Sequence, residues 1–132
     1  MFDIDLMSRI PIYEQLYRKV IELILKSVLT EQDKLPSVRS LATQLGVNPN
    51  TVAKAYSLLE RDGIIYSLAG RGSFIAKPDK MLAQERVLRD FDSAVSHALD
   101  IGISQKTLTE RIDQIAEEKS DQNLNQKGDL PS

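Results

Sequence analysis

The sequence has 132 residues, of which 42% are apolar and 27% charged, so it fits one or two small domains and is too short for a large enzyme scaffold. It contains no cysteine, which excludes disulfides and thiolate metal sites, and it contains no apolar run long enough to cross a membrane. Residues 1–80 carry 11 Lys and Arg against 9 Asp and Glu, a net charge of +2, whereas residues 81–132 carry 6 against 10, a net charge of −4. The positive half is therefore where a polyanionic partner is expected.

The first part of the chain predicts a short lead, Met1–Arg9, and then a helix over residues 11–28. The acidic start of the lead is unlike a signal peptide, so we expect a cytoplasmic protein. Pro11 suits the first turn of a helix, where its missing N–H costs nothing. The apolar residues that follow have helical spacing: Ile12, Leu16, Val20, Leu23 and Ile24.

Two short helices separated by a glycine turn come next. Ser37 is predicted to cap the first helix, and Gly46 suits the left-handed position after its end. Asn48 and Pro49 then form a start signal for a helix that runs to about Asp62. Each helix has one apolar face, formed by Val38, Leu41, Ala42 and Leu45 in the first and by Val52, Ala55, Tyr56 and Leu59 in the second.

A β-hairpin is predicted after the third helix. Ile64–Ser67 and Ser73–Ala76 are rich in β-branched and aromatic residues, and they flank the glycine-containing loop Leu68–Gly72. Pro78 ends this segment.

The last third of the sequence predicts two more helices. In the first, residues 81–99, four apolar residues at spacings of 3, 4 and 3 form a seam that suits a dimer interface: Leu88, Phe91, Val95 and Ala98. Gly102 ends this helix and Ser104 caps the next, whose inward face is expected to hold Leu108, Ile112, Ile115 and Ala116. Residues 119–132 are polar and lose periodicity, so we expect a disordered tail.

These elements predict a mainly α fold with a small β-hairpin (α+β). Residues 1–77 would form a winged helix-turn-helix, and residues 78–118 a two-helix dimerisation region. A helix-turn-helix inserts the start of its second helix into the DNA major groove, so the expected partner is double-stranded DNA. The candidate DNA-binding residues are Ser37, Arg39, Asn48, Asn50, Thr51, Lys54, Gly70 and Arg71.

The residue types fit this chemistry, although several have simpler explanations. An Asn side chain can form two hydrogen bonds with adenine, and Thr hydroxyls and helix N-termini can bind phosphates. An Arg between two glycines suits a narrow minor groove. Asn48, however, could serve only as an N-cap, and Arg39 could pair with an acid such as Glu60. Lys54 and Arg71 could be solvated surface charges. His97 has no ligand partner at helical spacing and is expected to be neither a metal ligand nor catalytic.

The combined motifs resemble the GntR family of bacterial regulators over roughly residues 9–77. They are the Leu-Pro-Ser-Val-Arg run at 35–39, the Leu-Gly-Val-Asn-Pro-Asn-Thr-Val run at 45–52 and the Gly-Arg-Gly-Ser-Phe-Ile run at 70–75. The resemblance implies that Arg39, the residues opening the third helix and the wing residues Gly70 and Arg71 contact operator DNA. Many family members have Arg or Ser where Pro49 stands, and several have Arg where Ala53 stands, which implies a different operator.

The short C-terminal part resembles the YtrA subfamily. That resemblance implies a homodimeric repressor of a near-palindromic operator, often in the regulator's own operon with transporter genes. About 50 residues after the wing cannot enclose a usual ligand pocket, so any small-molecule effector stays unknown and no cofactor or metal is expected.

Two other classes of function fit the sequence less well. A winged helix used only for protein contacts would lack the exposed polar residues at Asn50, Thr51, Lys54 and Arg71. An enzyme is disfavoured because the sequence has no cysteine, one histidine and no phosphate-binding glycine loop followed by lysine.

Overall fold

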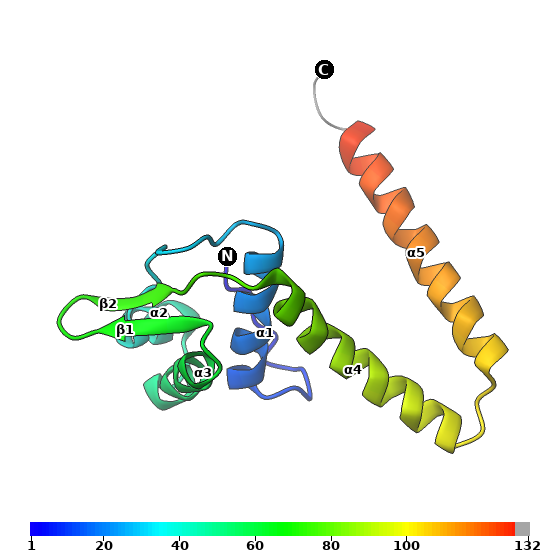
Figure 1. Ribbon diagram of the computed structural model, residues 1–132, viewed down its shortest axis with the longest axis horizontal. Coiled ribbons are helices and arrows are strands. Elements are labelled where there is room, and N and C mark those ends of the chain that lie inside the picture. Colours follow the sequence, from blue (N-terminus) through cyan, green and yellow to red (C-terminus); the bar gives the residue numbers. More distant parts are fainter. Residues whose placement is uncertain (129–132) are drawn as a thin grey trace. The chain divides into compact units, whose positions relative to one another are not determined.

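The structure is a computed structural model that describes the backbone of residues 1–128 and the side chains of residues 1–123. The elements within this range follow the order shown in Figure 1: α1 (Ile12–Leu25), α2 (Val38–Leu45), α3 (Pro49–Arg61), β1 (Ile65–Leu68), β2 (Gly72–Ile75), α4 (Lys80–Asp100) and α5 (Gln105–Gly128). This confirms the predicted fold of helices with one hairpin. The chain divides into an amino-terminal unit, Met1–Glu85, and a carboxy-terminal unit that begins at Arg86.

The turn between α2 and α3 follows from local hydrogen bonds. The Ser37 hydroxyl accepts the amide of Ser40 at 3.1 Å and so caps α2. Gly46 ends that helix with φ +69°, a value that glycine adopts without the strain a Cβ brings. The Asn48 side-chain oxygen then accepts the amide of Asn50 at 2.8 Å and starts α3. All the predicted caps of this turn are confirmed.

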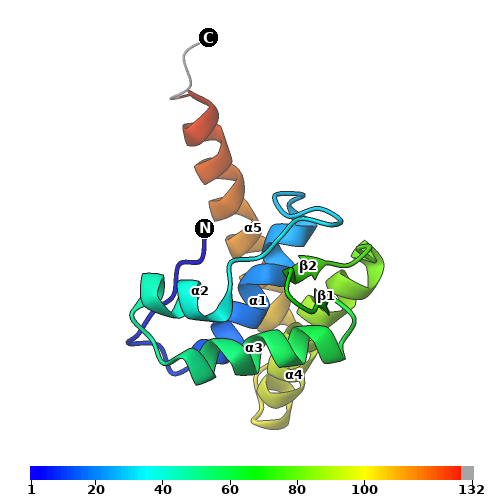
Figure 2. The same cartoon turned by 90° about the vertical axis from the view of Figure 1, so that its left-hand side faces the viewer.

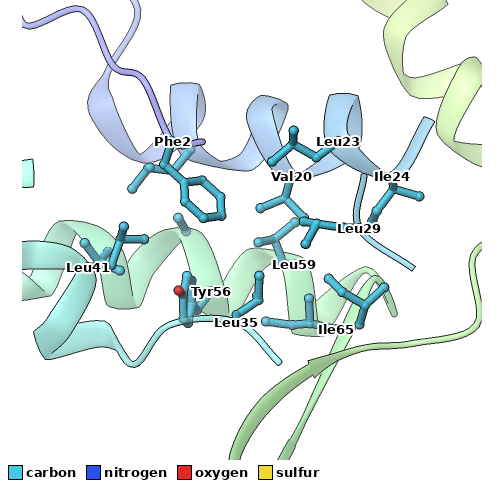
Figure 3. Close-up of a cluster of buried hydrophobic side chains, with 14 of the residues drawn as sticks. Phe2, Val20, Leu23, Ile24, Leu29, Leu35, Leu41, Tyr56, Leu59 and Ile65 are labelled. Carbon is cyan, nitrogen blue, oxygen red and sulfur yellow. The ribbon is translucent and has the colours of Figure 1, made fainter. Parts of the chain in front are cut away.

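The core of the amino-terminal unit lies between α1 and α3 (Figure 3). Leu16, Val20, Val52 and Leu59 are each at most 1% exposed. The Tyr17 hydroxyl donates to the carboxylate of Asp62 at 2.6 Å, which joins α1 to the C-cap of α3. The predicted apolar faces of both helices are therefore confirmed as core faces.

The segment predicted as a lead is part of this core. Phe2 is buried and points between the helices (Figure 3). The Gln15 side chain holds the segment to α1, since its oxygen accepts the amide of Asp5 at 2.8 Å and its nitrogen donates to the Asp5 carbonyl at 3.0 Å. Sequence spacing did not predict this contact, because the segment itself forms no regular element.

The segment at residues 32–35 pairs with the outer side of β2 through an isolated β-bridge, Lys34 opposite Phe74, which the sequence did not predict. β1 and β2 pair antiparallel with Ile65 opposite Ile75. On the other side of β2, the amides of Gln32 and Leu35 donate to Ile75 and Ser73 carbonyls at 2.8 and 2.9 Å, and the amide of Ile75 donates to the Asp33 carbonyl at 2.9 Å. Residues 32–35, for which the sequence predicts no regular element, therefore pair with β2 and place Leu35, 2% exposed, in the core.

α4 begins on the amino-terminal unit. Asp79 caps its first turn by accepting the amide of Leu82 at 3.1 Å, and the Lys80 ammonium donates to the hydroxyl of Ser27 at 2.9 Å. Ala83 is buried. These contacts explain why the division between the units falls after Glu85, inside α4, and not directly after residue 77.

α5 is longer than the sequence predicts. Ser104 caps it, as expected, by accepting the amide of Thr107 at 3.1 Å. The helix then continues to Gly128, through part of the segment for which the sequence predicts a tail. No Gly or Pro precedes Gly128 in α5, and its Glu, Lys and Gln residues favour helix. Residues 129–132 of the predicted tail lie outside the described residues. None of the described helices has the length and apolar character needed to span a membrane.

Candidate nucleic-acid interface

α2 and α3 meet through the short turn at Gly46, and α3 then leads into the hairpin (Figure 2). Tyr56 fixes the two helices to each other, because its hydroxyl donates to the carbonyl of Pro36 at 2.6 Å, just before the cap of α2. Burial raises the pKa of Tyr56 to about 12. The sequence predicts Tyr56 only as a core residue, since nothing local indicates this long-range hydrogen bond.

The start of α3 presents polar side chains to solvent. Asn48 is exposed and acts as the N-cap. Asn50 is exposed and Thr51 is half-buried, and neither side chain forms a hydrogen bond with any residue that the structure describes. These two side chains are therefore available to an external partner at the position where a recognition helix meets a groove.

Arg39 lies in the first turn of α2, two residues after Ser37. Its side chain is exposed and makes no ion pair with the described part of the chain. The alternative pairing with Glu60 is not formed among the described residues, and the Glu60 carboxylate accepts the Ser67 hydroxyl at 3.4 Å. The Arg39 guanidinium is thus free for a phosphate or a base edge.

Lys54 differs from a plain solvated charge. Its ammonium lies 3.9 Å from the centroid of the Tyr13 ring, which belongs to α1. Such a cation–π contact restrains an otherwise flexible side chain. The pairing joins residues 41 positions apart, so no local pattern in the sequence indicates it.

The wing is the loop between β1 and β2. The Arg71 amide donates to the Leu68 carbonyl at 2.9 Å and closes the turn. Gly70 and Gly72 on either side of Arg71 have φ of +76° and +112°, which only glycine adopts readily. The exposed side chain of Arg71 therefore stands at the tip of a glycine-defined loop.

The four predicted interface residues share one face of α4, as their spacing requires. Leu88 and Phe91 are 47% and 46% exposed, and Val95 and Ala98 are half-buried. Ile112 and Ile115 of α5, predicted to point inward, are also 47% and 50% exposed. Both helices thus carry apolar side chains that the described chain leaves largely uncovered.

Known proteins resemble the chain in sequence and in fold. The family model described as bacterial regulatory proteins, gntR family, matches residues 12–75. The HTH-type transcriptional repressor YtrA of Bacillus subtilis (strain 168) is 54% identical over 80 residues, which cover 61% of this chain and 62% of that protein. The HTH-type transcriptional regulator YhcF of the same organism, described as uncharacterized, is 33% identical over 113 residues, 83% of this chain and 93% of that protein.

Solved structures agree with these matches. A GntR family transcriptional regulator from Listeria monocytogenes superposes with a TM-score of 0.69 at 28% identity, covering 84% of this chain and 98% of that one. The DNA-binding domain of AraR, solved in complex with its operator ORX1, gives a TM-score of 0.50 at 29% identity, covering 56% of this chain and 92% of that one.

Proposed function

The chain belongs to the GntR family of bacterial regulatory proteins and is a transcription regulator, not an enzyme, and on this premise we propose that it is a homodimeric repressor of a near-palindromic operator. The observation that supports DNA binding most directly is the set of exposed or half-buried polar side chains on one helix-turn-helix. Arg39, Asn50 and Thr51 make no side-chain hydrogen bond or ion pair with described residues, yet Tyr56 and the caps fix the helices that carry them.

The roles of the individual residues follow from their positions. Asn50 and Thr51 enter the major groove with the start of α3, and Arg39 contacts the operator from the start of α2. The backbone amides that open each helix favour nearby phosphates. Gly70 lets the wing approach the duplex closely, and Arg71 enters the adjacent minor groove or binds its phosphates.

The proposed dimer uses the apolar face of α4. A closed two-fold dimer presents two identical reading helices, and this arrangement matches an operator with two inverted half-sites. The repressor YtrA shares 54% identity over its matched stretch, which spans only 62% of that protein, so repression is carried over as part of this proposal. The operator is expected upstream of the protein's own gene, in an operon with transporter genes, and the protein is expected to act in the cytoplasm, where the chromosome lies.

Fluorescence anisotropy tests this function. The purified protein is titrated with the duplex from upstream of its own gene and with a scrambled duplex, each over a range of salt concentrations. We expect tight binding to the first and weak, steeply salt-dependent binding to the second. Equal, weak binding to both duplexes would contradict the proposal, and no binding at low salt would favour the protein-interaction class.

Arg39→Ala is the sharpest variant for this assay. Losing a guanidinium that contacts a base or phosphate should weaken operator binding by roughly 10–100-fold, or about 1–3 kcal/mol. Arg111→Ala on α5 is the charge-matched control, because Arg111 is also exposed but lies in the carboxy-terminal unit. Equal affinities of the two variants would exclude Arg39 from the interface.

A further inference from the structure

The Lys34 side chain lies across a glycine of the wing. A Cβ built on Gly72 would come within 3.1 Å of the Lys34 Cε and 3.8 Å of its Nζ, and it would meet no other atom within 4 Å. Lys34 pairs with Phe74 in the sheet, so Gly72 is its diagonal neighbour on the same face. The stem of Lys34 therefore occupies the space that a side chain at position 72 would fill.

This arrangement directs the lysine toward the tip of the hairpin. On the same face, the rings of Tyr66 and Phe74 stack with centroids 5.6 Å apart, in the row of the ladder that Lys34 joins through its bridge to Phe74. Gly72 opposes Leu68 in the last pair, directly before the loop that carries Arg71. The end of the Lys34 side chain thus reaches the pair from which the loop begins.

The charge of Lys34 is not used within the described chain. The residue is exposed and forms no ion pair or hydrogen bond through its ammonium with any described residue. A lysine with a packed stem and a solvated head can present its charge at lower entropic cost than one on a free stem. Lys34 has the position and the unpaired charge needed to bind an anion beside the wing.

We propose that Lys34 is a second phosphate contact of the wing and that Gly72 positions it. This inference rests on the proposed DNA-binding function and adds a residue that none of the sequence motifs singled out. Lys34 neutralises one phosphate of the duplex beside the part held by Arg71. Gly72 thereby has two roles: it adopts φ +112°, and it leaves room for the lysine stem.

Salt-dependent operator binding tests the contact. Lys34→Gln keeps most of the stem but removes the charge, so it should weaken binding about 3–10-fold near physiological salt and lower the slope of log K against log salt by about one. Lys34→Arg should retain the slope. Lys106→Gln, an exposed lysine of α5, is the control and should match the wild type. An unchanged slope for Lys34→Gln would overturn the proposal.

A double-mutant cycle tests the role of Gly72. Gly72→Ala adds backbone strain in any background, but it displaces the lysine only where Lys34 is present. Its effect on operator affinity should therefore be at least threefold larger in the wild type than in the Lys34→Ala variant. Equal effects in both backgrounds would mean that Gly72 acts only through its φ, and that result would overturn the positioning role. Circular dichroism of each variant checks that the hairpin still folds.

Failure of the proposed function and failure of the Lys34 contact give different results. If the wild type shows no preference for the operator, both the proposed function and this inference are overturned. If the wild type is specific and Arg39→Ala weakens it while Lys34→Gln leaves affinity and slope unchanged, only the inference about Lys34 is overturned.

Discussion

The two units of the chain differ in where their apolar side chains lie. In Met1–Glu85 the buried apolar residues of three helices, the hairpin and the N-terminal segment form one cluster, in which Val52, Leu59 and Ile75 have no exposed surface. From Arg86 to residue 123 no side chain is buried, and Phe91 and Ile115 remain about half exposed.

This difference indicates two sources of stability. Burial of apolar surface contributes about 25 cal/mol per Å², so the amino-terminal unit is stabilised within one chain. The carboxy-terminal helices gain that contribution only when another surface covers them, and a helix without such packing is marginal in water. The first unit should therefore respond to core substitutions, and the second to protein concentration.

The strongest test of this contrast compares two leucines. Leu59→Ala empties a fully buried site and should destabilise the protein by about 2–5 kcal/mol at any protein concentration. Leu88→Ala removes the same atoms from a half-exposed site, and its effect on thermal unfolding should grow with protein concentration if α4 forms the dimer. Concentration-independent losses of similar size at both sites would contradict the division.

The next test removes the proposed interface. Replacing both Leu88 and Phe91 with Ser should produce monomers in sedimentation velocity and weaken operator binding by at least about 100-fold, because a monomer contacts one half-site only. Ser93→Glu is the control, since it lies on the opposite face of α4 by helical spacing. An intact dimer in the double variant would place the interface elsewhere.

A third test measures how the stability of the amino-terminal unit depends on pH through the buried residue Tyr56. The pKa of Tyr56 is raised from 10 to about 12 by burial, so the folded state favours the neutral phenol. Its contribution is fully present below pH 10 and is lost as pH rises toward 12, a change of about 2–3 kcal/mol.

The Tyr56 comparison is made by denaturant unfolding of the wild type and of Tyr56→Phe across this range. The variant should lose part of its stability at neutral pH, because the hydrogen bond to Pro36 is gone, but it should lose less between pH 10 and 12. Parallel stability curves would show that Tyr56 does not carry this pH dependence.

The smallest expected effect concerns the wing. Arg71→Ala should weaken operator binding a few-fold and lower the salt slope by about one if its guanidinium touches a phosphate. The same change at Arg111, in the carboxy-terminal unit, should leave both quantities unchanged. A slope that falls equally in both variants would assign DNA contact to both units.

Sequence reasoning succeeded where short-range hydrogen bonds decide the structure. Ser37, Gly46 and Asn48 act on residues two to four positions away, so their roles as caps were predictable. It failed where distant segments meet. Nothing near Phe2 indicates that it enters the core, and nothing near Lys34 indicates its place on the sheet.

The same distinction applies to the candidate site. Arg39, Asn50, Thr51 and Arg71 were identified by type and by place in a motif, and the structure shows them exposed or half-buried at the ends of their elements. The side chains that position the site, Tyr56 on Pro36 and Tyr13 under Lys54, act across 20 and 41 residues of sequence. Such pairs have no local signature.

The N-cap of α3 affects which operator bases its two asparagines can recognise. Recognition of adenine by an asparagine requires the side-chain oxygen to accept from N6 while the nitrogen donates to N7. The Asn48 oxygen already accepts the amide of Asn50, which uses one of its two lone pairs and fixes the side chain in the cap, while the amide nitrogen of Asn48 keeps both donors. It can address acceptors, such as guanine N7 and O6, thymine O4 or a phosphate. Asn50, whose side chain makes no hydrogen bond with a described residue, is the freer of the two to orient both its oxygen and its nitrogen toward adenine, so an operator adenine read at this point should lose its preference in Asn50→Ala.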